Sequence, residues 1–89
     1  MTNYSQRNAI SLDDAVNDMQ GKIGAVSKSA EIKVVKISDE EARISVFTGS
    51  AEVRLIRDAT LQPTLDYLTK QGLDIQVLIY DKDHPPEVG

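Results

Sequence analysis

The sequence contains no cysteine, no tryptophan and a single histidine, and aromatic residues make up only 4% of its 89 positions. Without cysteine, disulfides, thiolate metal sites and thiol nucleophiles are excluded. Small secreted domains commonly depend on disulfides, so their absence predicts a cytoplasmic protein. No apolar run reaches the length of a signal-peptide core or a membrane span. We therefore expect neither an export signal nor a membrane partner.

Charge of one sign is not in large excess either. Ten basic and fourteen acidic residues give a net charge of −4. Nucleic-acid affinity comes largely from Lys and Arg displacing counterions, so this balance disfavours nucleic acid as a partner. A chain of this length suits one domain and buries a modest share of its surface. Self-association would bury more, and we expect a homo-oligomer, most simply a homodimer.

The polar ends of the chain predict one central domain. Residues 1–10 lack hydrophobic periodicity and are expected to form a flexible segment. All periodic signals fall within residues 11–83, which we predict to be a single α+β domain. Residues 84–89 contain two prolines and are expected to form a stiff, exposed tail.

A helix is predicted over residues 11–28. Ser11 precedes the first apolar residue and is followed three positions later by Asp14, an acidic variant of the capping box. Spacings of four and three then place a set of apolar residues on one helical face. These residues are Leu12, Val16, Met19, Ile23 and Val26.

Three short segments after this helix predict an antiparallel meander. Residues 31–37 are rich in β-branched side chains, and residues 42–48 alternate between apolar and polar. Gly49 and Ser50 match a two-residue hairpin loop, in which glycine would supply the positive φ of a type II′ turn. Residues 51–57 alternate again and are predicted to be the return strand.

A second helix and a final strand complete the expected fold. Asp58 or Thr60 is predicted to cap the helix, and Gly72 to end it in a left-handed conformation. The leucines at spacings of four and three are expected to face the core; they are Leu61, Leu65 and Leu68. Residues 73–80 are apolar on both faces, which is typical of a strand covered on both sides.

The predicted order of elements is α-β-β-β-α-β. The last β-α-β step is a crossover, so the fourth strand should lie parallel to a neighbouring strand. Both helices should pack on one face of the four-stranded sheet, which defines an α+β fold.

No catalytic group stands out, and an enzyme is the less favoured expectation. A serine or threonine nucleophile needs a positioned base, and the only histidine is His84 in the predicted tail. Asp81, Asp83 and His84 combine oxygen and imidazole ligands and form a weak candidate metal site. A solvated strand end is the favoured interpretation of these residues, and we expect no metal or other cofactor.

Two sets of residues are candidate contact surfaces. The charged face of the predicted meander would carry Lys33, Arg43, Phe47, Glu52 and Arg54. Leu78 and Tyr80 are the candidate oligomer interface, because their strand is apolar on both sides in a small domain. An unpaired sheet edge also invites another strand.

These features favour a non-enzymatic protein-interaction or assembly module that is homo-oligomeric and binds another protein through a sheet edge or face. One alternative is a single-stranded nucleic-acid-binding domain that uses the charged sheet face and Phe47. Another is a small-molecule-sensing or accessory subunit of an enzyme complex, with a ligand pocket near Tyr67 and Tyr80.

Overall fold

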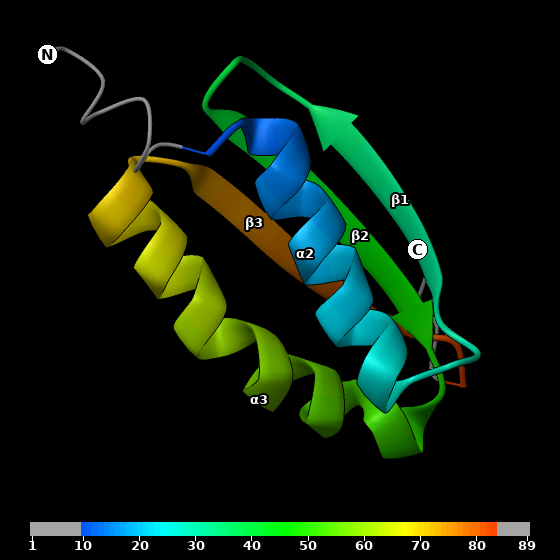
Figure 1. The fold of residues 1–89 in the computed structure, drawn as a ribbon. Coiled ribbons are helices and arrows are strands. Elements are labelled where there is room, and N and C mark those ends of the chain that lie inside the picture. The colour runs from blue at the N-terminus through cyan, green and yellow to red at the C-terminus, as the bar shows by residue number, and fades with distance from the viewer. Residues whose placement is uncertain (1–9, 84–89) are drawn as a thin grey trace, which may run out of the picture.

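The computed structural model describes residues 10–83, in which two helices cover one face of a three-stranded sheet (Figure 1). The elements are α2 (Leu12–Val26), β1 (Glu31–Lys36), β2 (Glu41–Thr48), α3 (Ser50–Asp66), the π-helical turn η1 (Tyr67–Gln71) and β3 (Asp74–Asp81). The α+β class is confirmed. The predicted tail at 84–89 and all but the last residue of the predicted N-terminal segment lie outside the described residues.

Helix α2 begins as predicted. The Ser11 hydroxyl accepts a hydrogen bond from the Asp14 backbone N–H at 3.0 Å, which satisfies one of the free donors of the first turn. Its apolar face is buried, and the residues on it are Leu12, Ala15, Val16, Met19 and Ile23. The helix ends at Val26, where Ser27 continues in an extended conformation.

The sheet has the strand order β1-β2-β3. Strand β1 pairs antiparallel with β2, and β3 pairs parallel with β2 after the crossover through α3, as predicted for the final strand. The apolar side of the central strand β2 is fully buried; it consists of Ala42, Ile44 and Val46. Strands β1 and β3 are the two edges of the sheet.

The predicted third strand of the meander is wrong, because residues 51–57 form the first turns of α3. Gly49 has a φ of −75° and is the N-cap of this helix, so no type II′ turn forms. Seven residues rich in Ala, Glu, Leu and Arg fit a helix as well as an alternating strand. The sheet therefore has three strands within the described residues, and it is mixed.

Distant carboxylates stabilise the start of α3. The Ser50 hydroxyl donates to Asp81 Oδ1 at 2.8 Å, and the Ser50 backbone N–H donates to Asp83 Oδ2 at 3.0 Å. Negative charge at a helix N-terminus is favourable. Both aspartates are more than 30 positions away along the chain, so a local sequence pattern does not reveal them.

The predicted core face of the second helix is also wrong. Within α3 the buried residues are Ile56 and Thr60. The three leucines at 61, 65 and 68 are 61%, 48% and 48% exposed, respectively. The physical reason is the earlier start of the helix. It brings Ile56 into the core, and the leucines five, nine and twelve positions later point away from that buried face.

The end of the helical segment is as predicted. Gly72 adopts the left-handed conformation with a φ of 71°. Its N–H donates to the Leu68 carbonyl at 3.2 Å, and the following Leu73 is buried. Glycine at this position stops the helix and turns the chain into β3.

Candidate functional site

Strand β3 is an edge of the sheet, and within residues 10–83 no other strand pairs with its outer side. The backbone N–H of Asp74 donates to the carbonyl of the residue just before β2, and the backbone N–H of Lys82 donates to the carbonyl of the last residue of β2, at 2.8 Å each. Even-numbered residues of β3 therefore turn their backbone groups toward β2. The alternation of a strand leaves the backbone groups of Ile75, Val77 and Ile79 pointing away from the sheet. We call this side the free edge of β3.

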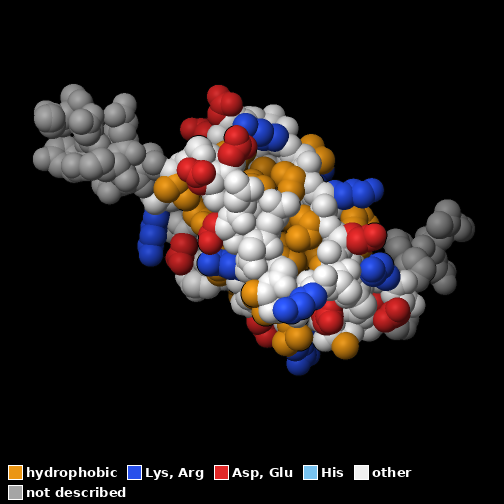
Figure 2. All heavy atoms as spheres, turned by 45° about the vertical axis from the view of Figure 1, so that its right-hand side comes forward, with side chains coloured by type: hydrophobic (Ala, Val, Ile, Leu, Met, Phe, Trp, Pro, Cys, Tyr) orange, Lys and Arg blue, Asp and Glu red, His pale blue; other side chains and the backbone are white. Residues whose placement is uncertain are grey.

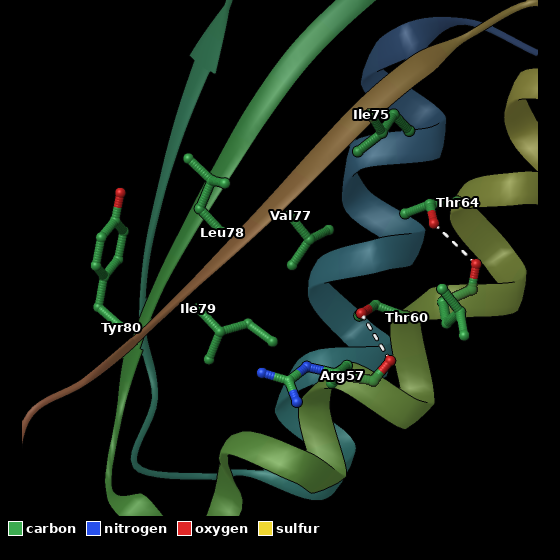
Figure 3. Close-up of a pocket in the computed structure, with 9 residues that line it drawn as sticks. Arg57, Thr60, Thr64, Ile75, Val77, Leu78, Ile79 and Tyr80 are labelled. Atoms are coloured by element: carbon green, nitrogen blue, oxygen red, sulfur yellow. Dashed lines mark hydrogen bonds between the residues drawn. The ribbon is translucent and has the colours of Figure 1, made fainter.

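A groove of about 330 Å³ runs beside the free edge, between β3 and α3. In Figure 3, Val77 and Ile79 point toward α3, whereas Leu78 and Tyr80 point to the other side of the strand. The α3 wall of the groove consists of Arg57, Thr60, Leu61 and Thr64. The groove is therefore apolar along the strand and mixed along the helix.

Three exposed leucines, two in α3 and one in η1, follow one another along the helical segment from this groove. Leu61, Leu65 and Leu68 are spaced by four and three residues, which aligns them on one helical face. We call them the leucine row, and Leu61 at one end of it lines the groove. Exposed apolar side chains next to an open strand are typical of an interaction surface.

The predicted oligomer-interface residues lie on this edge strand. Leu78 and Tyr80 are 38% and 37% exposed and line the groove from the side that faces away from the helices. Sequence reasoning missed the leucine row, although its spacing was visible, because the leucines were assigned to the core.

The open face of the sheet carries part of the predicted charged surface. Lys33, Arg43 and Phe47 lie there, on the side opposite to the buried residues of β2. The rings of Phe47 and Tyr80 stack with centroids 5.0 Å apart, and Lys33 Nζ lies 5.6 Å from the Phe47 ring centroid. The stacked pair joins this face to the edge strand β3.

The charges on the open face are mixed. Arg43 Nε donates to Gln76 Oε1 at 3.5 Å, and Gln76 Nε2 donates to Glu41 Oε2 at 3.0 Å. Figure 2, which brings the β1 edge forward, shows acidic and basic side chains interspersed with hydrophobic ones on that side of the molecule as well. A nucleic-acid surface needs concentrated positive charge, which this arrangement does not favour.

Glu52 and Arg54 do not belong to this face, because the segment predicted as a strand is helical. Arg54 is exposed on α3, on the helix-covered side of the sheet. Glu52 accepts hydrogen bonds from the hydroxyls of Ser27 and Thr48, the latter at 3.0 Å. Ser27 and Thr48 are 2% and 0% exposed, and their hydroxyl oxygens lie 2.9 Å apart. This cluster joins the end of α2 to the start of α3.

The cluster makes stability depend on pH. Hydrogen bonds from Ser27 and then Thr48 hold the pKa of Glu52 below its ordinary value of 4.5. A carboxyl with a depressed folded-state pKa contributes stability above its ordinary pKa, and this contribution is lost as the pH falls through the folded-state value. We expect Glu52→Gln to lower the free energy of unfolding near neutral pH and this effect to shrink as the pH falls below the ordinary value of 4.5, since Gln keeps the acceptor oxygen without titrating.

Urea denaturation across this pH range measures the effect. Glu40→Gln is the matched control, because Glu40 lies exposed in the turn between β1 and β2, and its pH profile should follow the wild type. Parallel profiles for the wild type and Glu52→Gln would contradict the prediction.

Tyr67 and Tyr80, which were expected near one ligand pocket, line different hollows. Tyr67 contributes to a shallow hollow with Asp18 and Lys22, whereas Tyr80 lies at the groove beside β3. The Tyr67 hydroxyl donates to Asp18 Oδ2 at 2.5 Å. Burial, followed by this hydrogen bond, raises the pKa of Tyr67 to about 12. Tyr67 therefore fastens the end of the α3 segment to α2.

The candidate metal ligands at the end of β3 accept hydrogen bonds from the first residue of α3. Asp81 and Asp83 hydrogen-bond Ser50, and the Asp83 N–H donates to Asp81 Oδ1 at 2.9 Å. Within residues 10–83, no group of three or more His, Asp or Glu side chains is placed to hold a metal ion. His84 lies outside the described residues.

No protein-family model, curated protein or solved structure matches the chain. Among the described residues, no helix is long and apolar enough to cross a membrane. The strongest candidate for a functional site is the free edge of β3 with the groove and leucine row beside it.

Proposed function

We propose that the chain is a non-enzymatic assembly module that binds a partner polypeptide by adding a strand to the free edge of β3. The observation that carries the proposal is a backbone edge that no other described strand pairs, directly beside a groove that is apolar along the strand. Strand addition satisfies the backbone groups of such an edge and places alternate side chains of the incoming strand in neighbouring pockets. The leucine row offers further apolar contact.

The two edge strands differ in a way that supports this choice. Edge strands that stay unpaired are commonly protected by lysines, prolines or bulges. Strand β1 carries Lys33 and Lys36, whereas the six residues of β3 from Ile75 to Tyr80 include no charge. β3 therefore has the composition of a strand that is covered in its working state.

The hydroxyl–carboxylate cluster at the helix junction supports a non-enzymatic role. Ser27, Thr48 and Glu52 resemble part of a catalytic set in residue type, but both hydroxyl-bearing residues are buried. A nucleophile has to reach its substrate, and these hydroxyls are engaged with Glu52 in the interior. The cluster is therefore better suited to holding the helices together.

Amide exchange tests strand addition directly. A synthetic peptide with the sequence of residues 73–82 serves as the probe strand, and exchange is followed by NMR. Where β3 is unpaired, we expect the amides of Val77 and Ile79 to exchange more slowly as peptide is added, because an added strand bonds them. The amides of Gln76 and Leu78 already face β2 and should change little.

The control peptide carries proline in place of Val77 and Leu78, which removes a donor from each side of the strand. It should leave the exchange rates unchanged. Fast exchange at Val77 and Ile79 that persists at every concentration of the β3 peptide would contradict the proposed function, whereas slow exchange before peptide is added is the result expected if a strand already occupies the edge.

A further inference from the structure

We propose that the partner is a second copy of this chain, whose β3 pairs antiparallel with the first β3 across a two-fold axis at Leu78. This inference rests on the proposed strand addition and names its partner and register. The resulting assembly is a continuous six-stranded sheet in the order β1-β2-β3-β3-β2-β1. A two-fold interface uses the same surface on both copies, so the edge must be complementary to itself.

The backbone of β3 meets this requirement. An axis at Leu78 places Val77 of each copy opposite Ile79 of the other. Both residues turn their N–H and C=O groups outward, so the pair exchanges hydrogen bonds. Leu78 then lies opposite Leu78 as a non-hydrogen-bonded pair, which is the closer kind of antiparallel pair.

The charges at the two ends of β3 select this register, because Asp74 begins the strand and Lys82 directly follows it. With the axis at Leu78, Asp74 of each copy lies opposite Lys82 of the other, which forms two pairs of opposite charge. A shift of the axis to Val77 places Asp74 opposite Tyr80, and a shift to Ile79 places Lys82 opposite Gln76. Opposite charges facing each other across strands are stabilising. They also offset the repulsion between two copies that each carry a net charge of −4.

The same axis accounts for the exposed leucine row. Helix α3 lies beside β3, on the side of the molecule away from β1 (Figure 1). A two-fold axis normal to the sheet brings the two α3 helices antiparallel and adjacent on one face, so their leucine rows face each other. Stable interfaces bury about 800 Å² on each partner, more than a pair of edge strands contributes alone. The helix contact supplies the remaining apolar area.

A cysteine scan tests the register, because the chain has no cysteine of its own. Opposing Cα atoms of a non-hydrogen-bonded pair lie about 4.5 Å apart, within the range that a disulfide spans. We expect Leu78→Cys to form a disulfide-linked dimer under mild oxidation at micromolar concentration. Non-reducing electrophoresis follows the product over time.

Two control variants distinguish cross-linking that depends on the register from cross-linking that depends only on the exposure of the cysteine. Val35→Cys lies on β1 at the opposite edge and is more exposed than Leu78, at 55% against 38%. Gln76, the site of the second variant Gln76→Cys, lies on the same face of β3 as Leu78. In the proposed register, however, position 76 of one copy and position 76 of the other are offset by four residues, or about 13 Å along the strand. Both should cross-link at least about tenfold more slowly than Leu78→Cys, because disulfide formation requires close Cα atoms.

Light scattering completes the test. The wild type should be a dimer and Leu78→Lys a monomer with an unchanged circular dichroism spectrum. A wild type that stays monomeric, or equal cross-linking through Val35→Cys or Gln76→Cys, would overturn the inference. If the β3 peptide still slows amide exchange at Val77 in a monomeric wild type, strand addition stands and only the second copy is refuted.

Discussion

Ile56→Ala is expected to lower the free energy of unfolding by about 2–5 kcal/mol, the usual cost of truncating a large aliphatic residue in a core. Ile56 is fully buried in the core cluster, which α2, α3 and the sheet share. The substitution removes apolar contacts and leaves a cavity that the surrounding side chains fill only in part. In a small domain such a loss is a large fraction of the total stability.

Leu65→Ala is the matched substitution on the other flank of the same helix. Leu65 is about half exposed, so we expect a loss below about 1 kcal/mol at low protein concentration, where few contacts are removed. Urea denaturation measures both variants. At higher protein concentration the effect of Leu65→Ala should grow, since a dimer stabilises the folded state by mass action. Equal losses for Ile56→Ala and Leu65→Ala at low concentration would show that the buried face of α3 is assigned incorrectly.

Thr48→Val is expected to lower the free energy of unfolding by about 1.5–3 kcal/mol, the range for hydrogen bonds to charged groups. Valine keeps the shape of the side chain but loses the hydroxyl, which lies 2.9 Å from the Ser27 hydroxyl and 3.0 Å from Glu52 Oε1. The change therefore removes the hydrogen bond from Thr48 to Glu52 at a buried junction without leaving a large cavity.

Thr69→Val is the control for this substitution. The Thr69 hydroxyl donates to the Leu65 carbonyl at 2.9 Å on the exposed side of η1. Both residues are β-branched with similar helix propensity, so the change should stay within about 0.5 kcal/mol. Denaturation curves measured at one pH compare the two variants. If Thr48→Val is no more destabilising than Thr69→Val, the junction does not stabilise the packing of the helices.

Several elements were predictable because their signals are local. The Ser11 cap and the apolar stripe from Leu12 to Ile23 lie within one stretch of chain, and α2 forms there. Gly72 supplies a positive φ that other residues rarely adopt, which marks the end of the helical segment. The alternation in residues 42–48 likewise identified the central strand β2.

The site was predictable only in part. Leu78 and Tyr80 were selected because their strand is apolar on both faces, and the structure places them on an exposed edge. Lys33, Arg43 and Phe47 share the open sheet face. Glu52 and Arg54 do not lie on it, because the segment predicted as the third strand belongs to α3. The groove itself depends on how α3 lies against β3, which no single segment encodes.

The sequence by itself determined which segments are amphipathic, where the first helix begins and where the second one ends, since capping and hydrophobic spacing act within a few residues. Only the tertiary structure decided between helix and strand for residues 51–57, because Asp81 and Asp83 reach the start of α3 from the far end of the domain. It also decided which face of α3 is buried. The face with Ile56 and Thr60 is buried and the face with most leucines is exposed. Burial follows from the orientation of the whole helix on the sheet and not from local hydrophobicity.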